Sequence, residues 1–408
     1  MPQETVPQSG LSTLGRIPRG VWTLGFVSMC MDLSSELIHS LLPLYLAIGL
    51  AASTLTIGIV EGIAEATAMI VKLFSGVISD YIRRRKALVV LGYGLAAATK
   101  FIFPLAPTLG WVVAARFADR VGKGIRGAPR DALIADLTPS DLRGASFGLR
   151  QALDTVGAVG GPLLAIGAMA YFASDFKAAF WVAVVPAVVC VLLLIFGVEE
   201  PKAPAGARAE DAPPMKLRDA RRLGRRYAIV VGIAAVLTLA RFSEAFLILR
   251  AKDLGIPTMM APWVMVVMSL VYAVVAYPAG WAADRGFGSR LLATGLASLI
   301  AADLALANAG GALLLYAGAA LWGLHMGLTQ GLLAALVAAS APPDLRGTAF
   351  GVFNLVCGIA LFAASVLAGW LWDTFGPSLT FYAGAGFTLL AWIGLARLGG
   401  GATELRQA

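Results

Sequence analysis

The sequence predicts an all-α membrane protein with twelve transmembrane helices in two six-helix bundles, and three observations support this prediction. Of the 408 residues, 59% are hydrophobic and only 14% are charged, with a mean hydropathy of +0.80. This composition is far more apolar than that of soluble proteins. Apolar runs long enough to cross a bilayer follow one another from Val21 almost to the C-terminus. In addition, two separate segments of the first half recur in the second half.

The apolar runs define twelve expected helices. These cover 20–47, 54–80, 86–107, 110–136, 143–172, 176–198, 227–252, 259–284, 289–308, 311–340, 345–373 and 376–398. A helix of about 20 residues, at about 1.5 Å per residue, spans the hydrocarbon core. The segment between the sixth and seventh helices carries four prolines and eight basic residues and reads as a polar linker. We therefore expect a tail at 1–19, a first bundle at 20–198, a linker at 199–226, a second bundle at 227–398 and a tail at 399–408.

The basic residues indicate the orientation in the membrane. The formal charge of +8 comes largely from one set of alternate loops, which contain Arg16, Arg19, the 83–86 cluster, Arg143, the linker, Arg285, Arg290 and Arg346. The opposite loops near 48–53, 104–110 and 308–312 contain no Lys or Arg. Loops rich in Lys and Arg remain in the cytoplasm. We expect a multi-pass protein of a bacterial inner membrane with both termini in the cytoplasm.

The two halves of the chain repeat each other. PSDLRGASFG at 139–148 matches PPDLRGTAFG at 342–351 with an offset of 203. Gly76 and Asp80 recur as Gly280 and Asp284 with an offset of 204. A nearly constant offset in two separate loops indicates duplication, which predicts two bundles related by a pseudo-two-fold axis.

The loop after the second expected helix reads GVISDYIRRRK at 76–86. It is similar to the signature loop of the major facilitator superfamily, with a Gly, an Asp and a basic cluster, although Tyr81 replaces a basic residue and Arg83 replaces a Gly. The chain resembles this family over essentially its whole length. An Asp beside a basic cluster at a helix end can form contacts that break when the two bundles rock. The gating residues expected in this loop and its repeat are Gly76, Asp80, Arg83, Arg84, Lys86 and Asp284.

Two further motifs carry the resemblance. In the fourth helix, RVGKG at 120–124 is similar to the Arg-plus-Gly motif that is often linked to proton coupling. In the fifth helix, Gly148, Gly157, Gly161 and Pro162 have the spacing G-x8-G-x3-G-P, which resembles the motif associated with antiporters, without its trailing glycine pair. We expect Gly157, Gly161 and Pro162 to permit close helix packing or bending during gating.

The fourth helix carries a charged stripe. Seven charged residues lie on one face at 100° per residue: Arg116, Asp119, Arg120, Lys123, Arg126, Arg130 and Asp131. Each intramembrane charge costs about 2.5 to 3.5 kcal/mol at a helix centre, so the stripe must face protein, water or solute. Near the cytoplasmic end, Arg126, Arg130 and Asp131 are expected to be architectural.

Other helices offer partners for the stripe. Asp32, Glu36 and His39 share a face of the first helix, Glu61, Glu65 and Lys72 share a face of the second, and Arg150 and Asp154 lie at i,i+4 on the fifth. In the resembled family, the first, fourth, seventh and tenth helices line the central cavity. The expected proton-coupling residues are Asp32, Glu36, Arg120 and Asp154. The expected substrate-binding residues are Arg116, Asp119, Arg120, Lys123, Arg150, Glu61, Glu65, Arg241, Glu244, His325 and Gln330.

These residues lead to a functional hypothesis. Burial favours the neutral form of a carboxyl group and a nearby arginine favours the ionised form, so the two effects together can make a proton switch. We expect a secondary active transporter that works by alternating access, as a proton-coupled antiporter that exports a small organic anion or zwitterion. The open alternatives are a symporter that imports an organic anion, a metal transporter, and a lipid-handling or receptor protein on the same fold.

The sequence offers no support for an enzyme. Two histidines and scattered serines give no nucleophile with an oriented base. Met29, Cys30 and Met31 are adjacent and do not share a helix face, so they are poor metal ligands. We expect no cofactor and no metal site, with the proton gradient as the energy source. The expected partners are a small-molecule substrate and the lipid bilayer, without nucleic acid, and the expected state is a monomer.

Overall fold

The computed structural model describes residues 15–82, 84–200, 222–329, 331–342 and 345–398. Arg83 and Gln330 lie outside the described residues, as do the two tails at 1–14 and 399–408 and most of the linker. Asp80 is described only as part of a helix backbone.

The first six expected spans are all helices. They are α2 (Arg19–Leu44) with its π-helical extension η1 (Tyr45–Gly49), α3 (Thr54–Ile82), α4 (Arg85–Leu105), α5 (Leu109–Leu137), α6 (Arg143–Tyr171) and α7 (Phe176–Gly197). A short 3-10 turn, η2 (Ser140–Leu142), precedes α6. The bounds differ from the expected ones by a few residues because helix ends fray.

The second six spans are also helical, and two of them are broken. They comprise α8 (Gly224–Ala240) and α9 (Ala245–Asp253), η5 (Thr258–Met260) and α10 (Trp263–Ala282), η6 (Ala283–Phe287) and α11 (Gly288–Ala307), α12 (Ala312–Thr329) and α13 (Leu332–Ser340), α14 (Arg346–Phe375), and α15 (Pro377–Leu398). The expected helix 227–252 is interrupted at residues 241–244. The expected helix 311–340 is divided into α12, which ends at Thr329, and α13, whose N-cap Gly331 has a φ of +79° that suits glycine.

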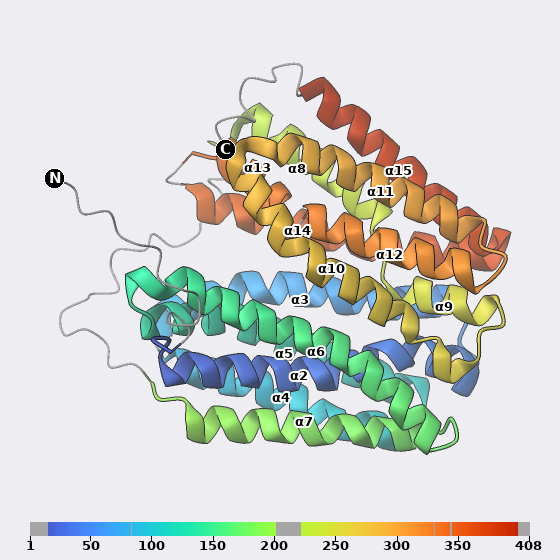
Figure 1. Cartoon of the computed structure of the whole chain (residues 1–408), viewed down its shortest axis with the longest axis horizontal. Coiled ribbons are helices and arrows are strands. Elements are labelled where there is room, and N and C mark those ends of the chain that lie inside the picture. Colours follow the sequence, from blue (N-terminus) through green and yellow to red (C-terminus); the bar gives the residue numbers. More distant parts are fainter. Residues whose placement is uncertain (1–14, 83, 201–221, 330, 343–344, 399–408) are drawn as a thin grey trace.

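The helix positions confirm the duplication. The starts of α4, α5 and α6 recur as the starts of α11, α12 and α14 at the same offset of 203 residues. Figure 1 shows the first six spans as one layer and the second six as another. Among the described residues, nine stretches are long and apolar enough to cross a membrane, and one of them, Thr258–Ala307, contains both α10 and α11. Outside this set, α3 and α5 are 29 residues long each and carry many of the charges. The all-helical, two-bundle membrane fold is thus confirmed.

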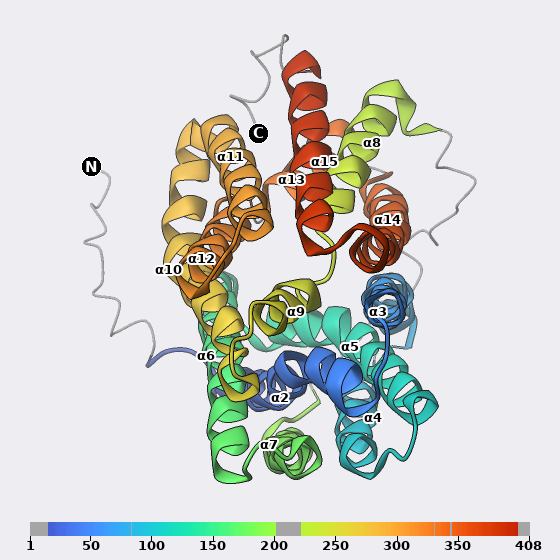
Figure 2. The ribbon, with the colours of Figure 1, turned by 90° about the vertical axis from the view of Figure 1, so that its right-hand side faces the viewer.

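The two bundles meet along two flanks. Figure 2 shows α3 beside α14 on one flank and α6 beside α10 on the other, with α9 between the bundles next to α2. We call the end where α2 begins and α7 ends the linker end, and the opposite end, where α3 begins and α14 ends, the far end.

The apolar core differs between the two ends. Towards the far end, buried side chains of both bundles, such as Leu41 and Phe246, belong to one continuous core. Towards the linker end there are two separate cores among the described residues, one in the first bundle around Leu24 and one in the second around Tyr227. The bundles are therefore packed together at the far end and less so at the linker end.

A carboxylate bridges the bundles at the far end. Asp373, near the end of α14, accepts hydrogen bonds from the backbone N–H groups of Thr54 at 3.1 Å and Leu55 at 2.8 Å. These N–H groups belong to the first turn of α3, which has no acceptors within its own helix. A negative charge is also favoured at a helix N-terminus. Asp373 thus stabilises contact between the two bundles.

Asp373→Ala is expected to shift the protein towards a far-end-open conformation. Loss of such a cap costs about 1 kcal/mol, or roughly a fivefold change in the ratio of conformations. The ratio can be measured from spin-label distances between Thr108→Cys and Leu313→Cys, at the far ends of α5 and α12. Asp175→Ala is the matched control, because Asp175 caps its own helix α7 and not another bundle. An unchanged distance distribution in Asp373→Ala would show that the cap does not hold the bundles together.

Candidate functional site

A cavity of about 420 Å³ lies between the two bundles. Its walls come from α2, α3 and α5 of the first bundle and from α8, the 241–244 segment, α12, α13 and α14 of the second. Both bundles supply charged or titratable side chains to it: Glu36, His39, Glu65, Arg120 and Lys123 from the first, and Arg241 and Glu244 from the second. Trp322, Met326 and Phe353 provide apolar walls.

The break between α8 and α9 places two of these charges. The chain leaves helical geometry at Arg241, with φ −104° and ψ 55°. The N–H of Ser243 donates to the hydroxyl of Ser365 on α14 at 3.2 Å, which gives one freed backbone group a partner. Non-helical backbone is tolerated at membrane depth where it is buried in protein or lines a cavity. Arg241 and Glu244 make no ion pair or side-chain hydrogen bond with the described residues.

A chain of ionic contacts connects three helices behind the cavity. His39 contacts Glu36 at 3.2 Å and Glu61 at 3.8 Å, and Glu61 accepts from Arg116 at 2.6 Å. Arg116 and Glu61 are almost fully buried, with side chains at most 2% exposed. This pair joins α5 to α3. Because neither residue lines the cavity, the pair is not placed to contact a solute there.

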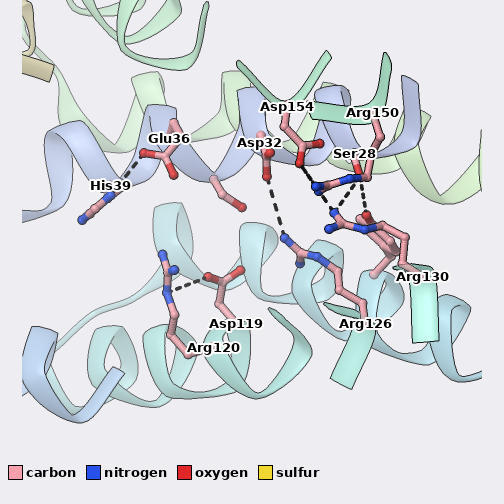
Figure 3. Close-up of polar contacts among 12 residues, drawn as sticks. Ser28, Asp32, Glu36, His39, Asp119, Arg120, Arg126, Arg130, Arg150 and Asp154 are labelled. Atoms are coloured by element: carbon pink, nitrogen blue, oxygen red, sulfur yellow. Dashed lines mark hydrogen bonds and ion pairs between the residues drawn. The ribbon is translucent and has the colours of Figure 1, made fainter. Parts of the chain in front are cut away.

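Arg120 and Glu65 form the part of this chain that faces the cavity. Arg120 Nη1 lies 3.2 Å from Glu65 Oε1, and its Nε lies 3.6 Å from Asp119 (Figure 3 shows Arg120 and Asp119). The structure thus places Glu65 beside Arg120, and neither Asp32 nor Glu36, two of the acids expected to couple protons, forms an ion pair with it. The buried Nε and Nη2 of Arg120 have no hydrogen-bond partner among the described residues, so this side chain has donors to spare.

Sequence reasoning missed Lys100. Its ammonium group is buried and donates to Asp119 at 2.8 Å and to Ser35 at 3.1 Å. Asp119 therefore belongs to a buried pair and does not line the cavity. A lone lysine in the middle of the apolar run 86–107 was the available signal, since an intramembrane charge needs a partner.

Three other expected residues form a second cluster towards the linker end (Figure 3). Arg150 donates to Asp154 at 2.5 Å, and Arg130 lies 3.9 Å from the same carboxylate. Asp32 lies 4.0 Å from Arg126, whose guanidinium stacks 4.6 Å from the centre of the Tyr93 ring. None of these residues lines the cavity, so Asp32, Arg150 and Asp154 are placed beside the site and not in it.

Two glycines of the antiporter-like motif, Gly157 and Gly161, pack α6 against α2, whereas the Cβ position of Gly148 has no atom within 4 Å. A Cβ atom added to Gly157 would lie 2.8 Å from Asp32 Cβ, and one added to Gly161 would lie 2.6 Å from Glu36 Cβ. Pro162 is buried in the same stretch of α6. These glycines therefore let α6 contact the backbone of α2 next to both of its acidic residues.

The remaining expected residues lie away from the cavity. His325 is fully buried and its Nδ1 contacts the carbonyl oxygen of Gly295 at 2.8 Å. At the linker end, Lys86 donates to the Ile195 carbonyl at 2.9 Å, and Arg84 and Asp284 are exposed. Gly76 packs against Ala128, with its Cβ position at 3.4 Å.

Comparison with known proteins identifies the family. The family model of the Major Facilitator Superfamily matches residues 24–365 and 245–402 of this chain. An uncharacterized MFS-type transporter of Methanocaldococcus jannaschii is 31% identical over 386 residues, which cover 92% of this chain and 94% of that protein. The inner membrane transport protein YajR of Escherichia coli is 25% identical over 387 residues, 90% of this chain and 80% of that protein.

Solved structures agree on the fold. The nucleoside transporter NupG superposes with a TM-score of 0.74 at 14% identity, covering 93% of this chain and 99% of its own. The human organic anion transporter MFSD10 superposes with a TM-score of 0.63 at 18% identity, covering 92% and 99%. The duplicated bundles, the central cavity and these matches lead to one conclusion: this chain belongs to the major facilitator superfamily and is a membrane transporter, not an enzyme.

Proposed function

We propose that this transporter is a proton-coupled antiporter that exports a small organic zwitterion or anion from the cytoplasm. The observation that carries the proposal is a set of unpaired charges on opposite walls of the cavity. Lys123 from the first bundle, and Arg241 and Glu244 from the second, have no ion pair or side-chain hydrogen bond with the residues that the structure describes.

Unpaired charges in a cavity between bundles indicate the chemistry of the ligand. An ionised group removed from bulk water is costly unless an opposite charge accompanies it. An anionic group of a solute can lie between Lys123 and Arg241 and so bridge the two bundles. A cationic group, if the solute has one, can pair with Glu244. Such a solute contacts both bundles and can therefore bias their relative positions.

Arg120 and Glu65 provide a means of coupling to protons. In this conformation Glu65 holds Arg120 at 3.2 Å. Protonation of Glu65 removes the negative charge and frees Arg120 to reorganise, so that the proton and the solute compete for the same charged pocket. Proton and solute then influence each other through the same arginine, and by linkage this influence is reciprocal. Glu36, paired with His39 on α2 of the same bundle, is a second candidate for this role.

The packing supports a direction of opening. The bundles share one core at the far end and have separate cores at the linker end, and the cavity lining reaches Leu333 and Phe353 on the linker-end halves of their spans. We propose that the linker end is cytoplasmic, in a bacterial inner membrane, because the basic residues gather in its loops. This conformation would then receive solute from the cytoplasm.

Glu65→Gln is expected to stop pH-driven flux and to preserve exchange of solute for solute. A thermal-shift screen of organic anions and zwitterions first identifies a ligand, since a ligand that binds only the folded protein raises its apparent stability. Proteoliposomes loaded with that ligand are then given a pH gradient of either sign. Solute should move against protons in the wild-type protein and in Asp175→Asn, which keeps a good helix cap. Solute movement in the same direction as protons would show symport and not antiport. Solute flux that does not depend on the pH gradient would show that transport is not coupled to protons.

Asp32→Asn and Glu36→Gln complete this series. Glu36 lines the cavity and Asp32 does not, so Glu36→Gln should reduce pH-driven flux more than Asp32→Asn does. If Asp32→Asn reduced pH-driven flux more than Glu36→Gln, the coupling site would lie in the linker-end cluster and not in the cavity.

A further inference from the structure

Asp303 is an isolated carboxyl group in the second bundle. Among the described residues, three carboxylic acids are buried: Glu61, Asp119 and Asp303. Glu61 is paired with Arg116 and Asp119 with Lys100, as described above. Asp303 on α11 has no exposed surface, and neither of its oxygens has a hydrogen-bond partner or an ion pair within the described chain.

The carboxyl group lies directly behind the broken helix. A Cβ atom added to Gly384 on α15 would lie 2.7 Å from Asp303 Oδ2 and 3.2 Å from Phe242 Cε1. Phe242 belongs to the 241–244 segment and lines the cavity. Its ring also packs against Trp322 and Phe381, with ring centres 5.5 and 5.7 Å apart. Aromatic side chains therefore separate Asp303 from the solute cavity.

No charged group among the described residues compensates Asp303. The titratable groups on the elements around it are Tyr316, His325, Tyr382, Arg397, Arg241, Glu244, Arg250, Lys252 and Asp253, with Arg290 on α11 itself. None of them is within hydrogen-bond or ion-pair distance of it. Arg250 is engaged by Asp253 and by the carbonyls of Leu306 and Ala309. The charged η6, with Asp284 and Arg285, lies at the other end of α11, about 27 Å along the helix axis.

The repeat shows what is missing. At the offset of 203 residues, Asp303 corresponds to Lys100 of the first bundle, and Trp322 corresponds to Asp119. The first bundle thus has a complete internal pair where the second has one acid and an indole. An ionised carboxylate without a partner is strongly disfavoured in an apolar interior, and these surroundings therefore favour the neutral, protonated form of Asp303. A leucine at position 303 would fill the same space without burying a polar group that lacks a hydrogen-bond partner.

We propose that Asp303 is a second proton-binding site, which holds its proton behind Phe242 in the conformation described here and releases it into the cavity, while the cavity opens towards the linker end, when Phe242 withdraws with the 241–244 segment. This inference rests on the proposed proton coupling. In the loaded state the proton is on the carboxyl oxygen. When Phe242 withdraws, water from the cavity reaches the carboxyl group and accepts the proton, leaving a hydrated carboxylate. Each transport cycle then moves two protons, one through the Arg120–Glu65 pair and one through Asp303.

The protonation state of Asp303 can be tested with an apolar carbodiimide, which reacts with protonated carboxyl groups in apolar surroundings. The full-length wild-type chain in lipid is treated at pH 7, and the labelled peptides are mapped by mass spectrometry. Asp303 is expected to be labelled, while the paired Glu61 and Asp119 are not. Absence of label at Asp303 would overturn the proposal.

The proton count provides the second test. At zero membrane potential, each coupled proton supports a tenfold solute gradient per pH unit. The wild-type protein is expected to reach about a hundredfold gradient per pH unit and Asp303→Asn about a tenfold gradient, with solute exchange intact in both. Asp303→Leu should behave like Asp303→Asn, and Asp175→Asn like the wild-type protein. Equal gradients in Asp303→Asn and the wild-type protein would reject Asp303 as a coupling site, whereas wild-type flux indifferent to pH would instead reject the proposed function. If neither Asp303 variant folds, the labelling of the wild-type chain decides the question.

Discussion

Gly58→Trp is expected to stop transport by holding the far ends of the two bundles apart. A Cβ atom at Gly58 on α3 would lie 2.2 Å from the carbonyl oxygen of Ser365 on α14 and 3.3 Å from Phe246 Cζ. The nearest atom is the backbone oxygen of Ser365, which cannot move aside by a change of rotamer as a side chain can. The two helices themselves must therefore separate. Gly369 makes a similar approach from α14, with its Cβ position 2.7 Å from the backbone of Leu55. Small residues of this kind let helices pack closely in membranes.

The measurement uses the same pair of spin labels as the Asp373 experiment. Gly58→Trp should give a long far-end distance in essentially all molecules and no solute exchange. Gly167→Trp is the matched control, because Gly167 is exposed on α6 and its Cβ position has no atom within 4 Å. Wild-type flux with an unchanged distance distribution in Gly58→Trp would show that the α3–α14 contact is not part of the transport cycle.

Arg116→Ala and Lys123→Ala are expected to fail in opposite ways, although the two residues share one face of α5. Arg116 is buried and donates to Glu61 at 2.6 Å. Removing one partner of a buried ion pair leaves an uncompensated charge and costs about 3 to 5 kcal/mol of unfolding free energy. Lys123 is exposed to the cavity and makes no ion pair or side-chain hydrogen bond with the residues that the structure describes. Its loss should leave stability nearly unchanged and weaken binding of an anionic ligand roughly tenfold or more.

Unfolding by detergent titration and ligand affinity by calorimetry separate the two outcomes. The double variant Arg116→Met with Glu61→Leu should recover most of the stability lost in Arg116→Ala, because neither charge is then left alone. Weaker binding in Arg116→Ala without a loss of stability, or a loss of stability in Lys123→Ala, would reverse the division of the stripe into architectural and solute-facing parts.

The sequence by itself determined the fold. A lipid environment leaves a backbone few options, since each segment must satisfy its own hydrogen bonds, and apolar runs of the right length therefore give the helices directly. The repeat at 139–148 and 342–351 added the division into two related bundles, which the helix positions confirm. Helical periodicity alone also places the charged residues of α5 on one face of the helix.

Only the tertiary structure decided which charges meet. Periodicity places Arg116, Arg120 and Lys123 on one face, but it says nothing about the depth at which α3 or α4 packs against that face. A shift of one turn between helices would give each side chain a different partner. Hence the pairing of Arg120 with Glu65 and the role of Lys100 had to come from packing. The break at residues 241–244 and the isolation of Asp303 behind Phe242 are decided in the same way, because both depend on contacts between helices distant in the chain.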